Sequence, residues 1–256
     1  MTNILETGGI PDAGIEARWI CEDALDEVQA LQIAERRAKH EPLQYLLGKW
    51  EFYGLDFYVG EGVLIPRADT ETLVDAVLSR CHVGSGDEIA DLCCGSGCIA
   101  VALQVHLEDA RVCGIELSPK AWEYARKNAA LHAPFMKIFC ANVLDPTTAA
   151  QFHGLAAITC NPPYLTREDM ESLQAEVRHE PELALGGGDD GLRYYREITA
   201  LWKDSLRPGG MLFYEVGIYQ AGDVAGILRE NGFTQVKVIQ DLNGIDRVVC
   251  GQVPNS

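Results

Sequence analysis

The sequence predicts an α/β fold built on a mainly parallel, doubly wound sheet. From residue 88 onward, short apolar runs typical of strands alternate with segments that have helical periodicity. Strict alternation of this kind implies right-handed crossovers between parallel strands. The last two strands are separated only by a short turn at Asn243-Gly244, which leaves no room for a crossover helix. These two strands should therefore pair antiparallel, as a hairpin at the end of the sheet.

Seven strands are expected in this part of the chain, with helices between most of them. The strands cover residues 89–93, 111–116, 137–140, 155–160, 211–216, 235–239 and 247–251. The helices cover residues 99–107, 121–131, 192–206 and 220–230. The glycine-rich segment 186–191 is expected to be a mobile loop, because glycine lacks the side chain that would restrict the backbone.

The region ahead of the sheet predicts a helical segment followed by a hairpin. Residues 13–39 have helical apolar periodicity among acidic residues, in a piece expected to be too short for a core of its own. Apolar residues alternate with polar or turn residues through positions 51–59, which predicts a β-hairpin that bends near Gly54. Beyond Pro66, the acids Asp69 and Glu71 mark the start of another helix. We expect the chain to divide into three parts: a short helical segment at residues 1–48, a β-hairpin linker at residues 49–66 and the domain that contains the sheet at residues 67–256.

Composition and charge narrow the class of protein. The chain has 256 residues, of which 47% are hydrophobic, an ordinary globular composition without an apolar run long enough for a membrane helix. Its net charge of −17 disfavours a nucleic-acid substrate, because nucleic acids are bound through Lys and Arg. The first ten residues show no signal peptide, and the nine cysteines are irregularly spaced. A cytoplasmic protein without disulfides, metal site or membrane contact is expected.

The loop after the first strand of the sheet predicts a nucleoside site. It runs through Asp91, Leu92, Cys93, Cys94, Gly95, Ser96 and Gly97. In open α/β sheets ligands bind beyond the carboxyl ends of the strands, and the two glycines let the backbone turn sharply beside a ligand. Glu116 ends the next strand, 19 residues past Gly97, where a carboxylate can accept both ribose hydroxyls. Because Gly95-x-Gly97-x-x-Ala100 also fits a dinucleotide fingerprint, a nicotinamide-dependent dehydrogenase is an alternative, which the terminal hairpin disfavours.

A second motif, Asn161-Pro162-Pro163-Tyr164, follows the fourth strand. The two prolines fix the backbone and remove two donors, so the Asn161 side-chain oxygen and the Pro162 carbonyl are presented as acceptors. Two fixed acceptors suit the two hydrogens of a planar amine or amide. Tyr164 adds an aromatic face on which such a group can stack. The motif therefore predicts a clamp for an amine or amide, which a protein that merely senses a nucleoside would not need.

Together with the glycine loop and Glu116, this motif resembles the S-adenosylmethionine-dependent enzymes that methylate glutamine amides or the amines of adenine and cytosine. Further blocks at residues 41–48, 51–59, 64–71 and 180–192 are similar to the PrmC/HemK family, which methylates the glutamine of the Gly-Gly-Gln loop in class 1 peptide-chain release factors. The resemblance covers residues 41–251 and implies a Rossmann-like class I methyltransferase fold. It also implies that the segment before Glu41 is an abbreviated docking region for the release factor.

The resemblance assigns roles to individual residues. The loop from Cys93 through Cys94, Gly95 and Ser96 to Gly97 would surround the methionine part of S-adenosyl-L-methionine, Glu116 would bind the ribose, and Asn142 and Val143 would flank the adenine. Asp91 and Leu117 would also belong to the cofactor site. Asn161, Pro162, Pro163 and Tyr164 would hold the glutamine amide, with Asn161 also beside the cofactor. A ribosomal-protein glutamine and an adenine amine in nucleic acid are alternative acceptors. The blocks around Glu41 and Glu180 favour the release factor, and the negative charge disfavours nucleic acid.

Overall fold

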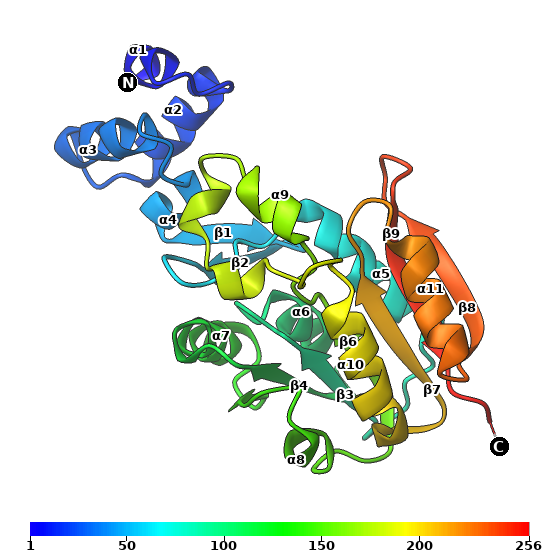
Figure 1. Cartoon of the computed structure of the whole chain (residues 1–256). Helices are drawn as coiled ribbons and strands as arrows, with labels where there is room; N and C mark the ends of the chain where they lie inside the picture. Colours follow the sequence, from blue (N-terminus) through cyan, green and yellow to red (C-terminus); the bar gives the residue numbers. More distant parts are fainter. Residues whose placement is uncertain (256) are drawn as a thin grey trace.

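The computed structural model describes residues 1–255, and its first part is a group of short helices. These are α1 (Thr2–Thr7), α2 (Ala13–Asp23), α3 (Glu27–Arg37) and α4 (Leu43–Leu47), and α1 to α3 stand apart from the sheet in Figure 1. The predicted helical stretch is interrupted at residues 24–26. Asp26 begins a new helix there, because its side chain accepts the Gln29 N–H at 2.8 Å.

Contrary to expectation, these helices have a small core of their own. Leu5, Ile10 and Ile20 are buried together with apolar residues of α3 and α4. The first 12 residues form an additional helix and turn that cover one side of this cluster. The expected lack of a core was wrong because the helices fold back on one another instead of forming a single extended helix. The functional division at residues 48 and 66 stays a prediction.

The predicted hairpin connects this segment to the sheet. Strands β1 (Lys49–Phe52) and β2 (Leu55–Tyr58) pair antiparallel through a two-residue turn in which Tyr53 and Gly54 both have positive φ, at 53° and 72°. Phe52 and Phe57 are buried against α5 (Glu71–Arg80) and α6 (Cys98–His106). The hairpin is therefore packed against helices that cover one face of the sheet.

The sheet has seven strands in the order β5-β4-β3-β6-β7-β9-β8. The strands are β3 (Glu88–Leu92), β4 (Arg111–Glu116), β5 (Lys137–Cys140), β6 (Leu155–Cys160), β7 (Leu206–Glu215), β8 (Thr234–Gln240) and β9 (Asp246–Gln252). All neighbours pair parallel except β9, which is antiparallel to both β7 and β8. The predicted mainly parallel sheet with a terminal antiparallel hairpin is confirmed.

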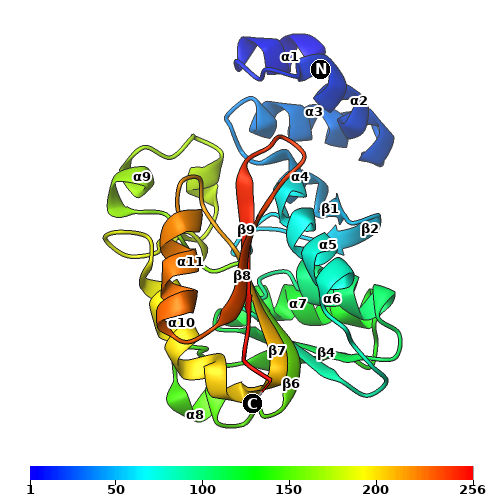
Figure 2. The same cartoon turned by 90° about the vertical axis from the view of Figure 1, so that its right-hand side faces the viewer.

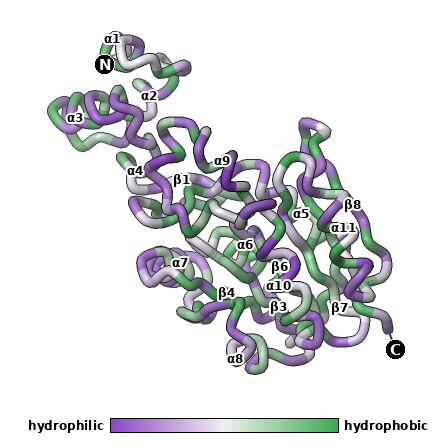
Figure 3. Tube along the Cα trace, viewed as in Figure 1, coloured by the Kyte–Doolittle hydropathy of each residue, from purple (hydrophilic) through white to green (hydrophobic). Residues whose placement is uncertain are grey.

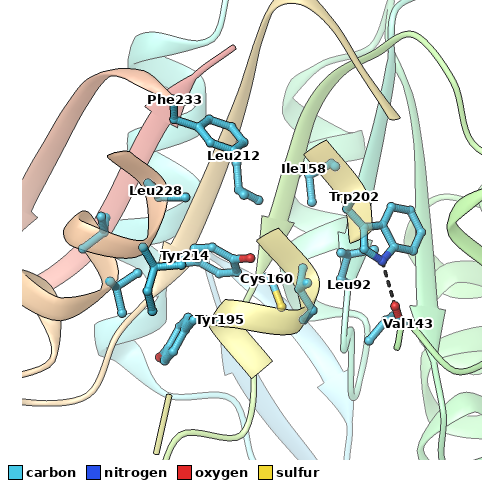
Figure 4. Close-up of a cluster of buried hydrophobic side chains, with 14 of the residues drawn as sticks. Leu92, Val143, Ile158, Cys160, Tyr195, Trp202, Leu212, Tyr214, Leu228 and Phe233 are labelled. Atoms are coloured by element: carbon cyan, nitrogen blue, oxygen red, sulfur yellow. Dashed lines mark hydrogen bonds between the residues drawn. The ribbon is translucent and has the colours of Figure 1, made fainter. Parts of the chain in front are cut away.

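Helices cover both faces of this sheet (Figures 1 and 2). Helices α5, α6 and α7 (Pro119–His132) lie on one face, and α8 (Pro146–Ala149), α10 (Arg193–Trp202) and α11 (Ala221–Glu230) on the other. Figure 3 shows hydrophobic residues concentrated in α6 and the central strands, and hydrophilic residues along α9 (Arg167–Glu171). In the core beneath α10, the buried Trp202 indole donates to the Val143 carbonyl at 2.8 Å (Figure 4). This bond anchors the loop after β5.

The strand order places a switch point between β3 and β6. From β3 the chain proceeds outward to β4 and β5 and then crosses back to β6, so a crevice opens beyond the carboxyl ends of β3 and β6. The loop after β6 contains α9 and two 3-10 turns, Val177–His179 and Glu182–Ala184. Within the glycine-rich segment 186–191, Gly187 and Gly191 are buried, and a Cβ on Gly187 would lie 2.6 Å from Tyr164 Cα, whereas residues 188–190 are exposed. These glycines permit close backbone approach.

Candidate active site

A cavity at the switch point collects most of the predicted cofactor residues. The space between its walls, counted together with its open mouth, is about 660 Å³. Of the residues predicted for the cofactor, it is lined by Cys93, Gly95, Glu116, Leu117, Asn142, Val143 and Asn161. The remaining wall comes from residues 62–64, Ser118, Ala121, Pro163, Pro181, Leu183, Ala184 and Tyr194. We call this the cofactor cavity.

The loop after β3 turns through three positive φ angles, 56° at Cys93, 56° at Gly95 and 79° at Gly97. A Cβ on Gly95 would meet no atom within 4 Å, so this backbone is open to a ligand. A Cβ on Gly97 would lie 3.3 Å from the Ala125 side chain, so this glycine allows α6 and α7 to pack closely. Cys93 adopts a conformation that costs a residue with a side chain roughly 1–2 kcal/mol, and it lines the cavity wall.

Four predicted cofactor residues lie behind the cavity wall. Asp91 is fully buried and accepts the Thr159 hydroxyl at 2.8 Å, and Cys94, Ser96 and Gly97 also stand outside the lining. The Ser96 carbonyl accepts the buried amide of Asn128 at 2.9 Å. The same amide donates to the Tyr58 carbonyl at 3.0 Å, so Asn128 ties the loop to the hairpin. No sequence motif singles out Asn128.

The buried position of Asp91 predicts a pH-dependent stability. Burial raises its pKa from the usual 3.8 to about 7. Between these values the folded chain keeps a proton that the unfolded chain releases, so the free energy of unfolding falls as pH rises toward 7. We expect Asp91→Asn, which can still accept from Thr159, to reduce this fall and to be more stable than the wild type at pH about 8. Urea unfolding across pH tests this, and equal pH dependence in both proteins would contradict it.

The Glu116 carboxylate is fixed by the backbone at the edge of the cavity. Its Oε2 accepts the Gly95 N–H at 2.8 Å and its Oε1 accepts the Ser118 N–H at 2.7 Å. Burial raises the pKa of Glu116, and these backbone bonds oppose that rise. Because each carboxylate oxygen has a second lone pair, both can still accept hydroxyl groups. The position therefore suits the two ribose hydroxyls of S-adenosylmethionine.

The loop after β5 offers an apolar surface and one amide to an adenine. Asn142 Oδ1 accepts the Leu144 N–H at 2.9 Å, which leaves its amide nitrogen as a donor. Val143 lines the cavity beside it and is anchored by Trp202. An apolar wall with one donor fits a purine ring. Together with the open Gly95 backbone and Glu116, these residues fit S-adenosylmethionine.

Asn161 lies between the cofactor cavity and a second cavity. The second cavity, which we call the acceptor cavity, holds about 530 Å³ including its mouth. Its lining consists of Leu64, Arg67, Asn161, Tyr164, Leu165, Val177, Ala184, Leu185 and Glu215. Leu64, Asn161 and Ala184 line both cavities. A group bound in either cavity can therefore reach Asn161.

The rest of the predicted clamp is divided between the two cavities. Pro162 is buried, Pro163 lines the cofactor cavity, and Tyr164 lines the acceptor cavity. Burial raises the pKa of the Tyr164 phenol, which stays neutral at physiological pH. The Tyr164 carbonyl accepts the Gln220 amide at 3.0 Å, which anchors the motif to the loop after β7.

A buried carboxylate joins the two segments that cover these cavities. Glu180 accepts the Ile65 N–H at 3.1 Å and pairs with the Arg67 guanidinium. The Glu180 side chain is 2% exposed, whereas that of Arg67 is 40% exposed. The pair holds residues 62–67 against residues 180–184, which supply much of the wall of both cavities. The sequence blocks around Arg67 and Glu180 do not by themselves predict that the two side chains pair.

We expect Glu180→Ala to loosen this wall. Removing the buried partner of an ion pair is strongly destabilising, but Arg67 keeps part of its hydration, so the expected loss is about 2 kcal/mol of unfolding free energy. The KM values for cofactor and acceptor should both rise. Denaturant unfolding and steady-state kinetics test this, with the exposed neighbour Glu182→Ala as the matched control. Wild-type stability in Glu180→Ala would contradict the role of the pair.

Two further polar residues beside Asn161 were not predicted from the sequence. Thr70 and Glu215 are both buried, and Thr70 Oγ1 lies 3.5 Å from Asn161 Nδ2. Thr70 belongs to the sequence block at residues 64–71, whereas Glu215 lies at the end of an apolar strand. A charged residue closing an otherwise buried run at the carboxyl edge of the sheet is the signal that marks Glu215.

Comparisons with known proteins agree with this geometry. A family model described as "Methyltransferase small domain" matches residues 68–180. The release factor glutamine methyltransferase of Geobacter sulfurreducens is 42% identical, over 96% of this chain and 91% of its own length. The chain belongs to the release factor glutamine methyltransferase family. The enzyme of the same name from Neisseria gonorrhoeae is 39% identical, over 90% of this chain and 84% of its own length.

Solved structures with low sequence identity share the fold. The catalytic domain of hMettl16 in complex with an RNA hairpin matches with a TM-score of 0.61 and 15% identity, over 88% of this chain and 82% of that one. A methyltransferase from Pyrococcus furiosus matches with a TM-score of 0.58 and 14% identity, over 79% of this chain and 91% of that one. The predicted Rossmann-like class I methyltransferase fold of this family member is thereby confirmed.

Proposed function

We propose that this enzyme transfers a methyl group from S-adenosyl-L-methionine to the side-chain amide nitrogen of the glutamine in the Gly-Gly-Gln motif of class 1 peptide-chain release factors. The observation that carries the proposal is the position of Asn161, between a cavity suited to the cofactor and a second cavity suited to a side chain. The names and high coverage of the relatives support the release factor as substrate.

The chemical task is to make a poor nucleophile react. The lone pair of an amide nitrogen is delocalised into its carbonyl group. Asn161 Oδ1 and the Pro162 carbonyl would accept the two amide hydrogens, which favours a pyramidal nitrogen and directs its lone pair toward the cofactor cavity. Tyr164 would support the planar amide from one side. The side chains would thus act mainly by positioning, an effect that reaches roughly 7–11 kcal/mol in well-aligned reactions.

Bound S-adenosylmethionine supplies an electrophilic methyl group on a sulfonium centre. We assign Glu116 and Leu117 to its ribose, Asn142 and Val143 to its adenine, and the Cys93–Gly97 loop to its methionine part. Asp91, Cys94, Ser96 and Gly97 would act by holding the loop in shape. After transfer, with S-adenosyl-L-homocysteine as the other product, the methylated nitrogen is acidic and loses its proton to water, so the chain needs no strongly basic group for this step.

The first 48 residues are proposed as a docking segment for the release factor, residues 49–66 as a linker and residues 67–256 as the catalytic domain. Five exposed apolar residues on and between α2 and α3 support a protein-binding role: Ile15, Trp19, Leu25, Val28 and Leu31. Within residues 1–255, none of the helices is long and apolar enough to cross a bilayer. We place the reaction in the cytoplasm, with a protein rather than nucleic acid as acceptor, in keeping with the net charge of −17.

Incubation with methyl-labelled S-adenosylmethionine tests the proposed acceptor. Separate reactions would contain a class 1 release factor, its Gln→Ala variant in the Gly-Gly-Gln loop, a ribosomal protein fraction and DNA. We expect label in the release factor and none in the Gln→Ala variant. Label confined to the ribosomal fraction or to DNA would overturn the proposal in favour of a ribosomal-protein glutamine or an adenine amine.

A further inference from the structure

Glu215 lies directly beside Asn161 at the carboxyl edge of the sheet. Strands β6 and β7 pair parallel with Cys160 opposite Tyr214, so the residues that follow, Asn161 and Glu215, lie side by side. Both line the acceptor cavity. Glu215 therefore reaches the site from a strand that contains none of the residues assigned to it above.

The Glu215 carboxylate is buried without a full set of partners. Glu215 is 2% exposed, and its Oε2 has no hydrogen-bond partner anywhere in residues 1–255. Burial raises the pKa of Glu215, whereas the Thr70 hydroxyl and the Asn161 amide lower it. These two groups lie 3.5 Å apart, measured from Thr70 Oγ1 to Asn161 Nδ2. An incompletely paired buried carboxylate destabilises a fold. A role in fixing its neighbour Asn161 would account for a carboxylate at this buried position.

We propose that Glu215 is a positioning residue that holds the Asn161 amide with its nitrogen toward β7 and its oxygen toward the acceptor cavity. The two ends of an amide are nearly equal in size, so only the surrounding donors and acceptors select one orientation. An ionised carboxylate can only accept, and it therefore selects the nitrogen end. The inference rests on the proposed function, because the cavity-facing oxygen is the atom that would accept the glutamine amide.

Protonation of Glu215 weakens this selection. A protonated carboxyl carries a donor, which can bond to Asn161 Oδ1 and hold the amide in the reversed orientation. Burial raises the pKa of Glu215 from the usual 4.5 to about 7. The carboxylate is therefore fully ionised only above neutral pH, and kcat should fall as pH drops through this range.

The other groups that face Glu215 do not produce the same pH dependence. Asp69 and Arg247 pair with each other at 3.1 Å, and both act on the Glu215 charge. Burial raises the pKa values of Tyr164, Tyr195 and Cys98, which stay neutral near pH 7. Arg67, which lines the acceptor cavity together with Glu215, is paired with Glu180. Asp91, farther back, also has a pKa of about 7. The decisive comparison is therefore between the wild type and a Glu215 variant.

The test measures kcat against pH with saturating S-adenosylmethionine and release factor for the wild type, Glu215→Gln, Thr70→Val and Tyr195→Phe. Glu215→Gln should lower kcat about 10- to 100-fold at pH 8, which corresponds to the loss of one hydrogen bond to a charged group. Its kcat should also no longer show the fall toward acidic pH (the acidic limb of the profile) that protonation of Glu215 causes in the wild type. The Kd for S-adenosylmethionine should stay unchanged. Thr70→Val removes a hydroxyl that lowers the Glu215 pKa, so its acidic limb should move to higher pH.

Tyr195→Phe is the matched control, because the Tyr195 hydroxyl donates to the Glu215 backbone carbonyl at 2.9 Å rather than to the carboxylate. It should keep the wild-type pH profile. A Glu215→Gln enzyme with wild-type kcat and an unchanged acidic limb would overturn the inference alone. If Glu215→Gln does not fold, the inference is overturned when kcat of Thr70→Val falls toward acidic pH in the same range as kcat of the wild type. Absence of transfer to the release factor by the wild type would instead overturn the proposed function.

Discussion

Asn161→Ala is expected to lower methyl transfer by roughly 10³-fold or more while leaving cofactor binding largely intact, because the variant removes one of the two acceptors that hold the amide. Asn161 borders both cavities, and its loss leaves the Pro162 carbonyl as the remaining acceptor of the clamp. Single-turnover transfer to the release factor measures the rate. Calorimetric titration with S-adenosylmethionine measures the Kd.

A matched control and a contradicting outcome make this test specific. Asn231→Ala is a matched control, because Asn231 follows α11 and donates its amide to the Ile227 carbonyl at 2.9 Å, outside both cavities. It should retain wild-type transfer. Full activity in Asn161→Ala would show that neither the proposed clamp nor the mechanism built on it operates in this enzyme.

The second large effect is expected at Glu116, where Glu116→Ala should raise the Kd for S-adenosylmethionine about 10- to 100-fold through lost hydrogen bonds to a charged group. The Gly95 and Ser118 N–H groups would also lose their acceptor. Glu116→Gln should weaken binding as well, because its amide nitrogen would face one of these two donors. The KM for the release factor should change little.

The matched control for Glu116 is Glu88→Ala, which removes an exposed carboxylate at the start of β3. Its Kd for S-adenosylmethionine should equal that of the wild type. A wild-type Kd in both Glu116 variants would remove Glu116 from the cofactor site and would require another ribose ligand.

Much of the seven-stranded sheet was predictable because its signals are local in sequence. Alternating strands and helices determine the parallel sheet, and the short turn at Asn243-Gly244 determines the antiparallel end. Strand β7 begins at Leu206, whereas the sequence predicted its start at residue 211. The prediction was wrong because Pro208, Gly209 and Gly210, which usually end a strand, lie within this one. The N-terminal core was missed because it forms only when separate short helices pack together.

The candidate site was predictable where residues stand in a motif and hidden where they meet through space. Seven of the predicted cofactor residues line one cavity, because the loops at one edge of a parallel sheet converge. Asn128 and Glu215, in contrast, lie on elements without a motif, and their roles depend on contacts with residues distant in sequence. The pairing of Arg67 with Glu180 likewise joins residues 113 positions apart.

The most direct test of the central claim is to identify the methylated atom by tandem mass spectrometry. A class 1 release factor would be incubated with the enzyme and S-adenosylmethionine, digested and sequenced. We predict a single methyl group on the side-chain amide of the Gly-Gly-Gln glutamine, formed by the wild type and by Asn231→Ala but not by Asn161→Ala. An unmodified glutamine, or methylation elsewhere in the release factor, would contradict the account.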